Sequence, residues 1–235
     1  MLVSDEPVPD AELGPRLAAG RDTVVYELGP DRVLRRATRD RSYVAEAQVM
    51  DHVRAAGYPV PAVHRVGPGE MVLERITGPT MLEDLVRRPW RVDRHARLLA
   101  DLHRRLHEIR GLPGMKAFAA PGDAVLHLDL HPANVLLPPS GPVVIDWTNA
   151  AVGAPGADVA LTWIVLRAFE SDASLAVRTL TSVVRRRLAR VFVDHAGRRE
   201  AVAALPAVAD HRAVDRNIRP TELRRMERLV SREVR

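Results

Sequence analysis

The 235-residue sequence contains no cysteine, and Lys116 is its only lysine. The absence of cysteine excludes disulfide bonds, thiolate nucleophiles and thiolate zinc sites, and it fits a reducing compartment. Aromatic residues make up only 4% of the chain, which disfavours a surface that binds nucleic acid by stacking bases on rings. No segment approaches the ~18 consecutive apolar residues of a membrane span. Because the acidic N-terminal segment also lacks the features of a signal peptide, we expect a soluble cytoplasmic protein with no membrane partner.

The positive charge is carried by arginine and is concentrated towards the C-terminus. The formal net charge is +5, and from residue 175 to the end 15 arginines stand against 7 acidic residues. Such a region can bind nucleic acid or an acidic partner, or it can consist of helices with solvated arginine faces. Since no aromatic residues are interleaved with these arginines, the sequence favours solvated helices and does not favour nucleic acid as a partner.

The first 80 residues have the pattern of short strands with one helix. Segments 23–28 and 32–37 flank a Gly-Pro-Asp turn, and segments 63–67 and 70–76 flank a Pro-Gly turn, so two hairpins are expected. Between them a helix is expected to begin at Ser42 and to end at Gly57, where glycine precedes Tyr-Pro.

Beyond a break at residues 76–79 the pattern becomes mostly helical. Leucines at 99, 102 and 106 are spaced by three and four residues, which predicts an amphipathic helix over 93–110. Short apolar runs follow at 125–130, 134–138 and 142–146, and the last two are expected to pair as a hairpin. From residue 157 we expect helices with breaks near Gly197, Pro206 and Pro220.

These patterns predict an α+β fold of two lobes. Residues 1–78 are expected to form a small, mostly-β lobe with one helix, and residues 79–235 a larger, mostly-α lobe.

Polar residues gather in two motifs, HLDLHPAN at 127–134 and VVID at 143–146. One interpretation is a metal hydrolase in which His127, Asp129 and His131 bind zinc. A helical pair, His103 and His107, also has ligand spacing, but the sequence offers no further histidine-rich stretch to complete such a site.

The other interpretation is phosphoryl transfer from ATP. This reaction needs a group that orients or deprotonates the accepting hydroxyl, and oxygen ligands that hold Mg²⁺ against the phosphates. Asp129 suits the first role. Asn134 and Asp146 suit the second, because the expected hairpin joins them.

The two motifs, together with Gly-Ala-Pro-Gly-Ala-Asp at 153–158, resemble the signature of the aminoglycoside phosphotransferase family. That family includes choline and homoserine kinase relatives and has a protein-kinase-like fold. The resemblance implies ATP and Mg²⁺ as cofactors, Asp129 as the catalytic base or orienter, and Asn134 and Asp146 as magnesium ligands. It also implies that His127 and Asp158 support the catalytic loop.

The resemblance assigns the nucleotide to the first lobe. Glu46 lies on the expected helix beside an apolar stripe, and a buried carboxylate needs a cationic partner. The family pattern supplies lysine at the end of Val-Leu-Lys, but here the text is Val-Leu-Arg35. Two interpretations stay open: Arg35 replaces the lysine, or the nucleotide site is degraded. The resemblance also implies that Leu73 is the gatekeeper, and that the backbone of Glu74 and Ile76 bonds the adenine edge.

The implied partner is a small molecule with a hydroxyl acceptor, an antibiotic or a metabolite. An aminoglycoside is a polycation and calls for an acidic surface, so the net basic C-terminal region argues against a dedicated aminoglycoside-resistance enzyme. Trp147 and Trp163 are candidate walls of the acceptor pocket, although the position of Trp147 directly after Asp146 suits core packing.

Two hypotheses from other classes remain. Arg35 motivates a pseudokinase or regulatory module that binds nucleotide without turnover, and the arginine-rich region motivates a binder of nucleic acid or an acidic partner. Neither explains the spacing of Asp129, Asn134 and Asp146.

Overall fold

The computed structural model describes residues 2–4, 6–20, 22–118, 121–168, 175–213 and 220–234. The chain divides into two compact units, Met1–Gly78 with Leu136–Thr148 and Pro79–Val135 with Asn149–Arg235. The first boundary between the two units follows Gly78. The segment Leu136–Thr148, however, packs with the first unit rather than with the helices around it in the sequence.

Three contacts explain why this segment joins the first unit. The N–H of Val144 donates to the carbonyl of Pro59 at 2.8 Å, and the ring of Trp147 packs edge-on against Tyr58 with centroids 5.7 Å apart. At Gly78 a Cβ atom would lie 2.8 Å from the backbone nitrogen of Pro138. Only glycine permits this close backbone approach, and no local pattern in the sequence reports it.

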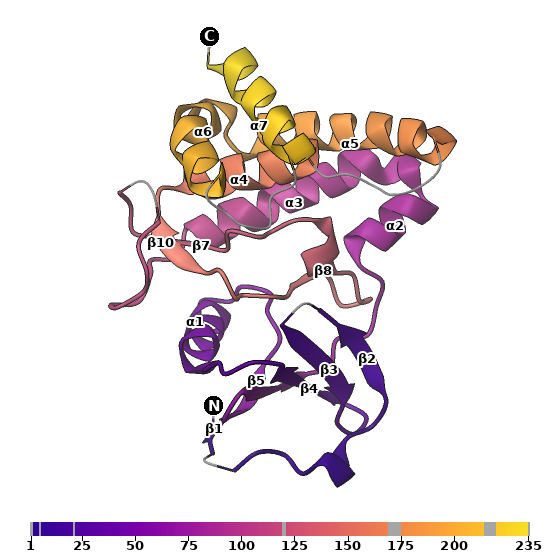
Figure 1. The fold of residues 1–235 in the computed structure, drawn as a ribbon, viewed down its shortest axis with the longest axis vertical. Coiled ribbons are helices and arrows are strands. Elements are labelled where there is room, and N and C mark those ends of the chain that lie inside the picture. The colour runs from indigo at the N-terminus through magenta and orange to yellow at the C-terminus, as the bar shows by residue number, and fades with distance from the viewer. Residues whose placement is uncertain are drawn as a thin grey trace. The chain divides into compact units, whose positions relative to one another are not determined.

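The first unit is built on a six-stranded sheet with the order β1-β5-β6-β4-β3-β2 (Figure 1). Its strands are β1 (Leu2–Val3), β2 (Arg16–Ala19), β3 (Thr23–Glu27), β4 (Arg32–Ala37), β5 (Val63–Gly67) and β6 (Glu70–Glu74). Neighbouring strands are antiparallel except β1 and β5, which are parallel. The two expected hairpins, β3–β4 and β5–β6, are confirmed. Strands β1 and β2 and the 3-10 helix η1 (Asp10–Glu12) were missed, because they are short and β2 is exposed throughout.

Helix α1 (Val44–Ala55) buries Glu46, Val49, Met50 and Val53, the stripe expected from the sequence. The chain leaves the helix through Gly57, whose φ of 80° is a conformation that glycine adopts without the penalty of a Cβ atom.

The pleat of β4 sends its arginines to opposite faces of the sheet. Leu34 is fully buried and packs with Val8 and Val72, and Arg36 shares its face. Arg35 lies on the other face, paired in register with Met71. The alternation therefore selects Arg35, and not Arg36, for the face that carries Glu46.

The second unit contains most of the helices. They are α2 (Met81–Arg87), η2 (Pro89–Arg91), α3 (Val92–His107), η3 (Pro132–Asn134), α4 (Pro155–Ala168), α5 (Leu175–Ala196), α6 (Arg198–Ala213) and α7 (Pro220–Glu233). Helix α3 packs on α5, and α4 packs on α6 and α7 (Figure 1). Two short strand pairs complete the chain: β7 (Ala124–Leu126) with β10 (Ala151–Gly153), and β8 (Val135–Leu136) with β9 (Val143–Val144). The amphipathic helix and the hairpin expected over 134–146 are confirmed.

The break expected at Pro206 is wrong, because α6 continues through it. Proline removes one backbone hydrogen bond and normally interrupts a helix. Here Pro206 lies on the exposed side of α6, where the carbonyl that loses its partner can reach water. The opposite face buries Ala201, Leu205 and Val208, and this packing holds the helix.

The two units thus have the secondary structure of an α+β fold, a mostly-β unit and a mostly-α unit. Among the described residues, no helix is both long enough and apolar enough to cross a lipid bilayer.

Candidate active site

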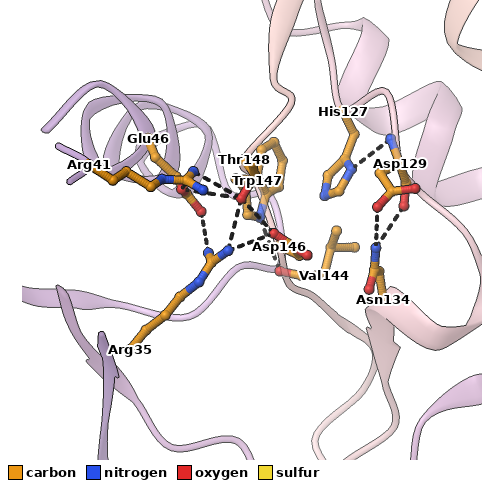
Figure 2. A network of polar contacts seen from close by, with 10 residues as sticks. All are labelled: Arg35, Arg41, Glu46, His127, Asp129, Asn134, Val144, Asp146, Trp147 and Thr148. Carbon is orange, nitrogen blue, oxygen red and sulfur yellow. Dashed lines mark hydrogen bonds and ion pairs between the residues drawn. The ribbon is translucent and has the colours of Figure 1, made fainter. Parts of the chain in front are cut away.

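In the first unit a buried ion-pair network joins β4, α1 and the segment after β9 (Figure 2). The guanidinium of Arg35 donates to Glu46 Oε1 at 2.5 Å and to Asp146 Oδ1 at 2.9 Å. Side-chain exposure is 11% for Arg35 and 5% for Glu46, whereas Asp146 is 42% exposed. One arginine therefore links two of the acidic residues singled out in the sequence.

Burial and charge oppose each other in this network. Burial raises the pKa of Glu46, and the positive charges of Arg35 and Arg41 offset part of that rise. Burial alone would lower the pKa of Arg35, but the charges of Glu46 and Asp146 outweigh it and raise the pKa. Arg35 is therefore held as a cation in a partly dehydrated position, where its charge acts more strongly than in water.

Two members of the network were not predicted from the sequence. Arg41 donates to Glu46 Oε2 at 2.9 Å and to Thr148 Oγ1 at 3.1 Å. Thr148 accepts from Arg35 at 2.8 Å and donates to Asp146 Oδ1 at 2.8 Å. Thr148 follows Asp146 by two residues, so a search for hydroxyl groups near each candidate acid would have found it. Arg41 lies outside α1, and nothing in its local sequence distinguishes it from the other arginines.

The backbone around the candidate acids is unusual. Asp146 has φ of 65° and Leu128, next to Asp129, has φ of 61°. Left-handed backbone at residues other than glycine is strained and gathers at functional sites. Trp147 is fully buried and donates its ring N–H to the carbonyl of Val144 at 3.2 Å. It is a core residue beneath Asp146 rather than an exposed wall.

In the second unit, Asp129 and Asn134 are held together on the loop between β7 and β8. The amide nitrogen of Asn134 donates to the backbone carbonyl of Asp129 at 2.9 Å and to its Oδ2 at 3.2 Å (Figure 2). His131 Nε2 lies 3.4 Å from Asp129 Oδ1. Because the amide nitrogen of Asn134 makes both contacts with Asp129, the amide oxygen of Asn134 points away from Asp129. A metal ligand would require this orientation.

Asp158 on α4 holds the backbone of this loop. Its carboxylate accepts the N–H groups of His127 at 3.1 Å and Leu128 at 2.8 Å, and the ring N–H of His107 at 3.0 Å. Burial alone would raise the pKa of Asp158, but the hydrogen bond from His107 and the charge interactions with His103, His107 and His127 together outweigh burial, so the pKa is lowered. His127 in turn accepts the N–H of Asp129 on its Nδ1 at 3.3 Å.

Thr162 and His103 also hold this loop, and the sequence did not predict their role. The hydroxyl of Thr162 donates to the carbonyl of Leu130 at 3.0 Å, and His103 Nε2 lies 3.1 Å from the same hydroxyl. The other ring nitrogen of His103 donates to the carbonyl of Leu99 at 2.9 Å. Thr162 is one turn after Asp158 on α4, so an i, i+4 search from Asp158 would have found it.

The donor set fits magnesium better than zinc. Within the described ranges, no three histidine, cysteine or acidic side chains gather closely enough to hold a metal ion by themselves. Magnesium keeps several water and phosphate ligands and takes only one or two oxygens from the protein. Asp146 in the first unit and Asn134 in the second each offer an oxygen of this kind.

The expected adenine-binding segment lies at the end of β6. The N–H of Glu74 donates to the carbonyl of Ala62 at 2.9 Å, so this donor is already used. The half-buried Ile76 has no hydrogen bond to any described residue. Leu73, the expected gatekeeper, is half-buried in β6.

Comparisons with known proteins show the family and the fold of the chain. The sequence matches the family model described as the phosphotransferase enzyme family over residues 14–124 and 117–200. No curated protein sequence matches the chain.

Solved structures share the fold over most of the chain. A thermostable mutant of aminoglycoside phosphotransferase APH(4)-Ia, in a ternary complex with AMP-PNP and hygromycin B, has a TM-score of 0.64 at 14% identity, covering 95% of this chain and 93% of that one. A choline/ethanolamine kinase family protein from Mesorhizobium loti has a TM-score of 0.59 at 18% identity, covering 94% and 90%. Amicoumacin kinase hAmiN has a TM-score of 0.51 at 12% identity, covering 99% and 89%.

At these identities the solved structures establish the protein-kinase-like fold alone. The family match covers most of the sequence, including both motifs at 127–146 and Asp158. The resemblance drawn from those motifs is confirmed, and the chain belongs to the phosphotransferase enzyme family.

Proposed function

We propose that this protein is a magnesium-dependent kinase that transfers the γ-phosphate of ATP to a hydroxyl group of a small molecule. The observation that carries the proposal is the position of Arg35, bonded at once to Glu46 and Asp146. In kinases of this fold a lysine pairs with a glutamate on the following helix and contacts the phosphates. Here Glu46, Asp129, Asn134 and Asp146 are all present, and an arginine stands for the lysine.

The chemistry of arginine supports this substitution. A guanidinium keeps its charge and grips carboxylate or phosphate oxygens through parallel N–H groups. Glu46, which also binds Arg41, holds one side of the Arg35 guanidinium. The N–H groups on the other side, which now bond Asp146, can bond phosphate oxygens instead. Arg41 stays on Glu46 when Arg35 does so, which keeps the buried carboxylate neutralised.

The contacts of the other residues support the roles proposed for them. Asp129 orients the accepting hydroxyl and takes up its proton, while Asn134 holds the Asp129 side chain in place. Asn134 and Asp146 supply oxygen ligands for magnesium, which when bound neutralises charge on the transferring phosphate. Asp158 and His127 keep the loop in its left-handed conformation at Leu128. For adenine, Ile76 offers a free N–H and Glu74 offers its carbonyl.

The acceptor is proposed as a small hydroxyl compound, an antibiotic or a metabolite. The solved relatives include complexes with hygromycin B and amicoumacin, and those ligands belong to those proteins. The basic C-terminal region of this chain does not suit a polycationic aminoglycoside, so neutral or acidic alcohols are the first acceptors to test.

The proposal is tested by calorimetric titration of ATP with and without magnesium, followed by a screen of hydroxyl compounds for release of ADP. We expect magnesium to strengthen ATP binding. Asp129→Asn should keep nucleotide affinity and lose turnover by about a hundredfold or more. Asp146→Asn should weaken binding only when magnesium is present.

Asp123→Asn is the matched control, because this exposed carboxylate precedes the catalytic loop and has no proposed role. Nucleotide binding with no turnover of any acceptor would favour the regulatory module motivated by Arg35. Equal magnesium-dependent affinity in Asp146→Asn and the unmodified protein would remove Asp146 from the metal site.

A further inference from the structure

Six arginines line a cavity of about 300 Å³ within the second unit. Its lining residues belong to α4, α5, α7 and the start of α6, and Figure 1 shows these helices in the second unit. The arginines are Arg167, Arg186, Arg187, Arg190, Arg198 and Arg232. The sequence indicated only solvated arginine faces in this region, so their convergence on one cavity is a property of the fold.

Acidic partners account for only half of this charge. Arg187 pairs with Asp93 at 2.6 Å. Arg198 and Arg232 share Glu233 at 3.0 and 3.4 Å, and Arg198 also pairs with Asp194 at 3.3 Å. Glu233 is the only carboxylate among the lining residues. The side chains that line the cavity therefore carry a large excess of positive charge.

The other three arginines, Arg167, Arg186 and Arg190, form no ion pair within the part of the chain that the structure describes. Arg186 and Arg190 are one turn apart on α5 and therefore share a face. Arg167 is half-buried. Burial lowers the pKa of its guanidinium, and the charges of Arg232 and Arg186 lower it further. Gathering like charges in this way destabilises the fold unless an anion offsets them.

The cavity lies on a different face of α4 from the one that supports the catalytic loop. Asp158 and Thr162 bond the loop backbone. Trp163 and Arg167 line the cavity. At 100° per residue, Trp163 is rotated by about 100° from Thr162 and about 140° from Asp158, and Arg167 by about 140° and about 180°. This cavity is therefore not the acceptor site that Asp129 would serve.

We propose that this cavity binds a small polyvalent anion with adjacent phosphate groups, held by Arg167, Arg186 and Arg190. Guanidinium groups bond two phosphate oxygens at once, which suits them to such a ligand. Trp163 does not offer a stacking surface for a base, because Arg198 covers its ring at 5.2 Å from the centroid. The chemistry thus favours a compact phosphate compound over a nucleic-acid strand.

The site is independent of the proposed kinase activity, and the experiment separates the two. Pyrophosphate is titrated into the full-length protein by calorimetry, without magnesium and at fixed ionic strength. We expect binding that weakens by more than about tenfold in Arg186→Gln/Arg190→Gln and in Arg167→Gln. Magnesium-ATP affinity, measured on the same samples, should not change in these variants. A protein that binds pyrophosphate but no ATP would refute the kinase and leave this site standing.

The matched control is Arg224→Gln/Arg228→Gln, which removes the same charge from exposed positions of α7 outside this cavity. It should bind pyrophosphate like the unmodified protein. The proposal is overturned by equal losses in the control and cavity variants, which would indicate a diffuse basic surface. Equal affinity for citrate, or stronger binding of a single-stranded oligonucleotide, would overturn the choice of a compact phosphate ligand.

Discussion

At the scale of single residues, the main departure from the family pattern is Arg35. A lysine ammonium is a compact point charge, whereas arginine presents a planar fork of donors. The structure uses that fork fully, since one Arg35 nitrogen bonds Glu46 and the other bonds Asp146 and Thr148. Arginine thus ties the carboxylate of α1 to the carboxylate after β9 within a single unit.

Two variants separate the effect of the positive charge from that of the planar guanidinium. Arg35→Lys keeps the charge but lacks the guanidinium, and Arg35→Met lacks both. Lysine restores the family residue, so we expect magnesium-ATP affinity within about tenfold of the unmodified protein. Methionine leaves Glu46 buried with Arg41 as its remaining partner, which should destabilise the fold by roughly 3 kcal/mol and weaken ATP binding more than tenfold. Urea unfolding and ATP titration measure the two effects.

Adding Glu46→Gln to Arg35→Met is the control for stability. It removes the buried charge that the methionine leaves behind, so part of the lost stability should return while ATP binding stays weak. Unchanged ATP affinity in Arg35→Met would show that this side chain does not contact the phosphates.

At the scale of elements, the loop at 127–134, proposed as the catalytic loop, is held by α3 and α4. Its backbone N–H groups converge on Asp158 of α4, and His107 of α3 supplies the third donor. Thr162 holds the carbonyl of Leu130 from the same face of α4. Two helices therefore hold the backbone on either side of Asp129.

Asp158→Asn should disturb this arrangement while leaving the nucleotide residues of the first unit in place. The asparagine nitrogen would face N–H groups that need an acceptor, and an unsatisfied buried donor costs about 1–3 kcal/mol. We expect kcat to fall much more than KM for ATP rises, because Asp129 is displaced. Steady-state kinetics measures kcat and KM, and urea unfolding measures the loss of stability. Asp101→Asn, at an exposed position of α3, should leave both unchanged, and a loss confined to KM would contradict the role given to Asp158.

The sequence predicted the elements whose patterns are local. The hairpins β3–β4 and β5–β6 and the stripes of α1 and α3 follow from turn residues and apolar spacing. The short strand β2 has no such spacing, and the continuation of α6 through Pro206 depends on contacts with α4 that a local pattern does not contain.

The candidate site divides in the same way. Asp129, Asn134 and Asp146 stand in recognisable motifs, whereas Arg41 and Thr148 become members of the Glu46 network only through folding. The arginines of the cavity come from four helices, and the sequence showed them only as an excess of charge.

At the scale of the whole molecule, long-range packing fixes the division of the chain. The segment Leu136–Thr148 leaves the helical part of the sequence and joins the sheet unit through Pro59, Tyr58 and Gly78. This packing places Asp146 beside Arg35. Asn134, twelve residues earlier, belongs to the other unit. The two residues proposed as magnesium ligands therefore belong to different units.

Stability of the whole chain should depend on pH through His103, which is fully buried. Burial lowers the pKa of His103 from 6.5 to about 4. Above pH 6.5 the histidine is neutral in both the folded and the unfolded chain, so its titration does not change the free energy of unfolding. Between pH 6.5 and 4 the unfolded chain binds a proton that the folded chain does not, so stability falls as pH decreases. A shift of this size corresponds to a loss of about 3 kcal/mol by pH 4.

Urea unfolding at pH 7 and at pH 4.5 tests this, with His103→Asn as the variant that cannot titrate. Asparagine keeps a donor for the carbonyl of Leu99, so the variant should fold, and its stability should fall less on acidification than that of the unmodified protein. Other groups, including Glu46 with its raised pKa, titrate in both proteins and cancel in the comparison. His64→Asn, at a half-exposed position of β5, should retain the full pH dependence. The same acid-induced loss in all three proteins would show that His103 is not the group responsible.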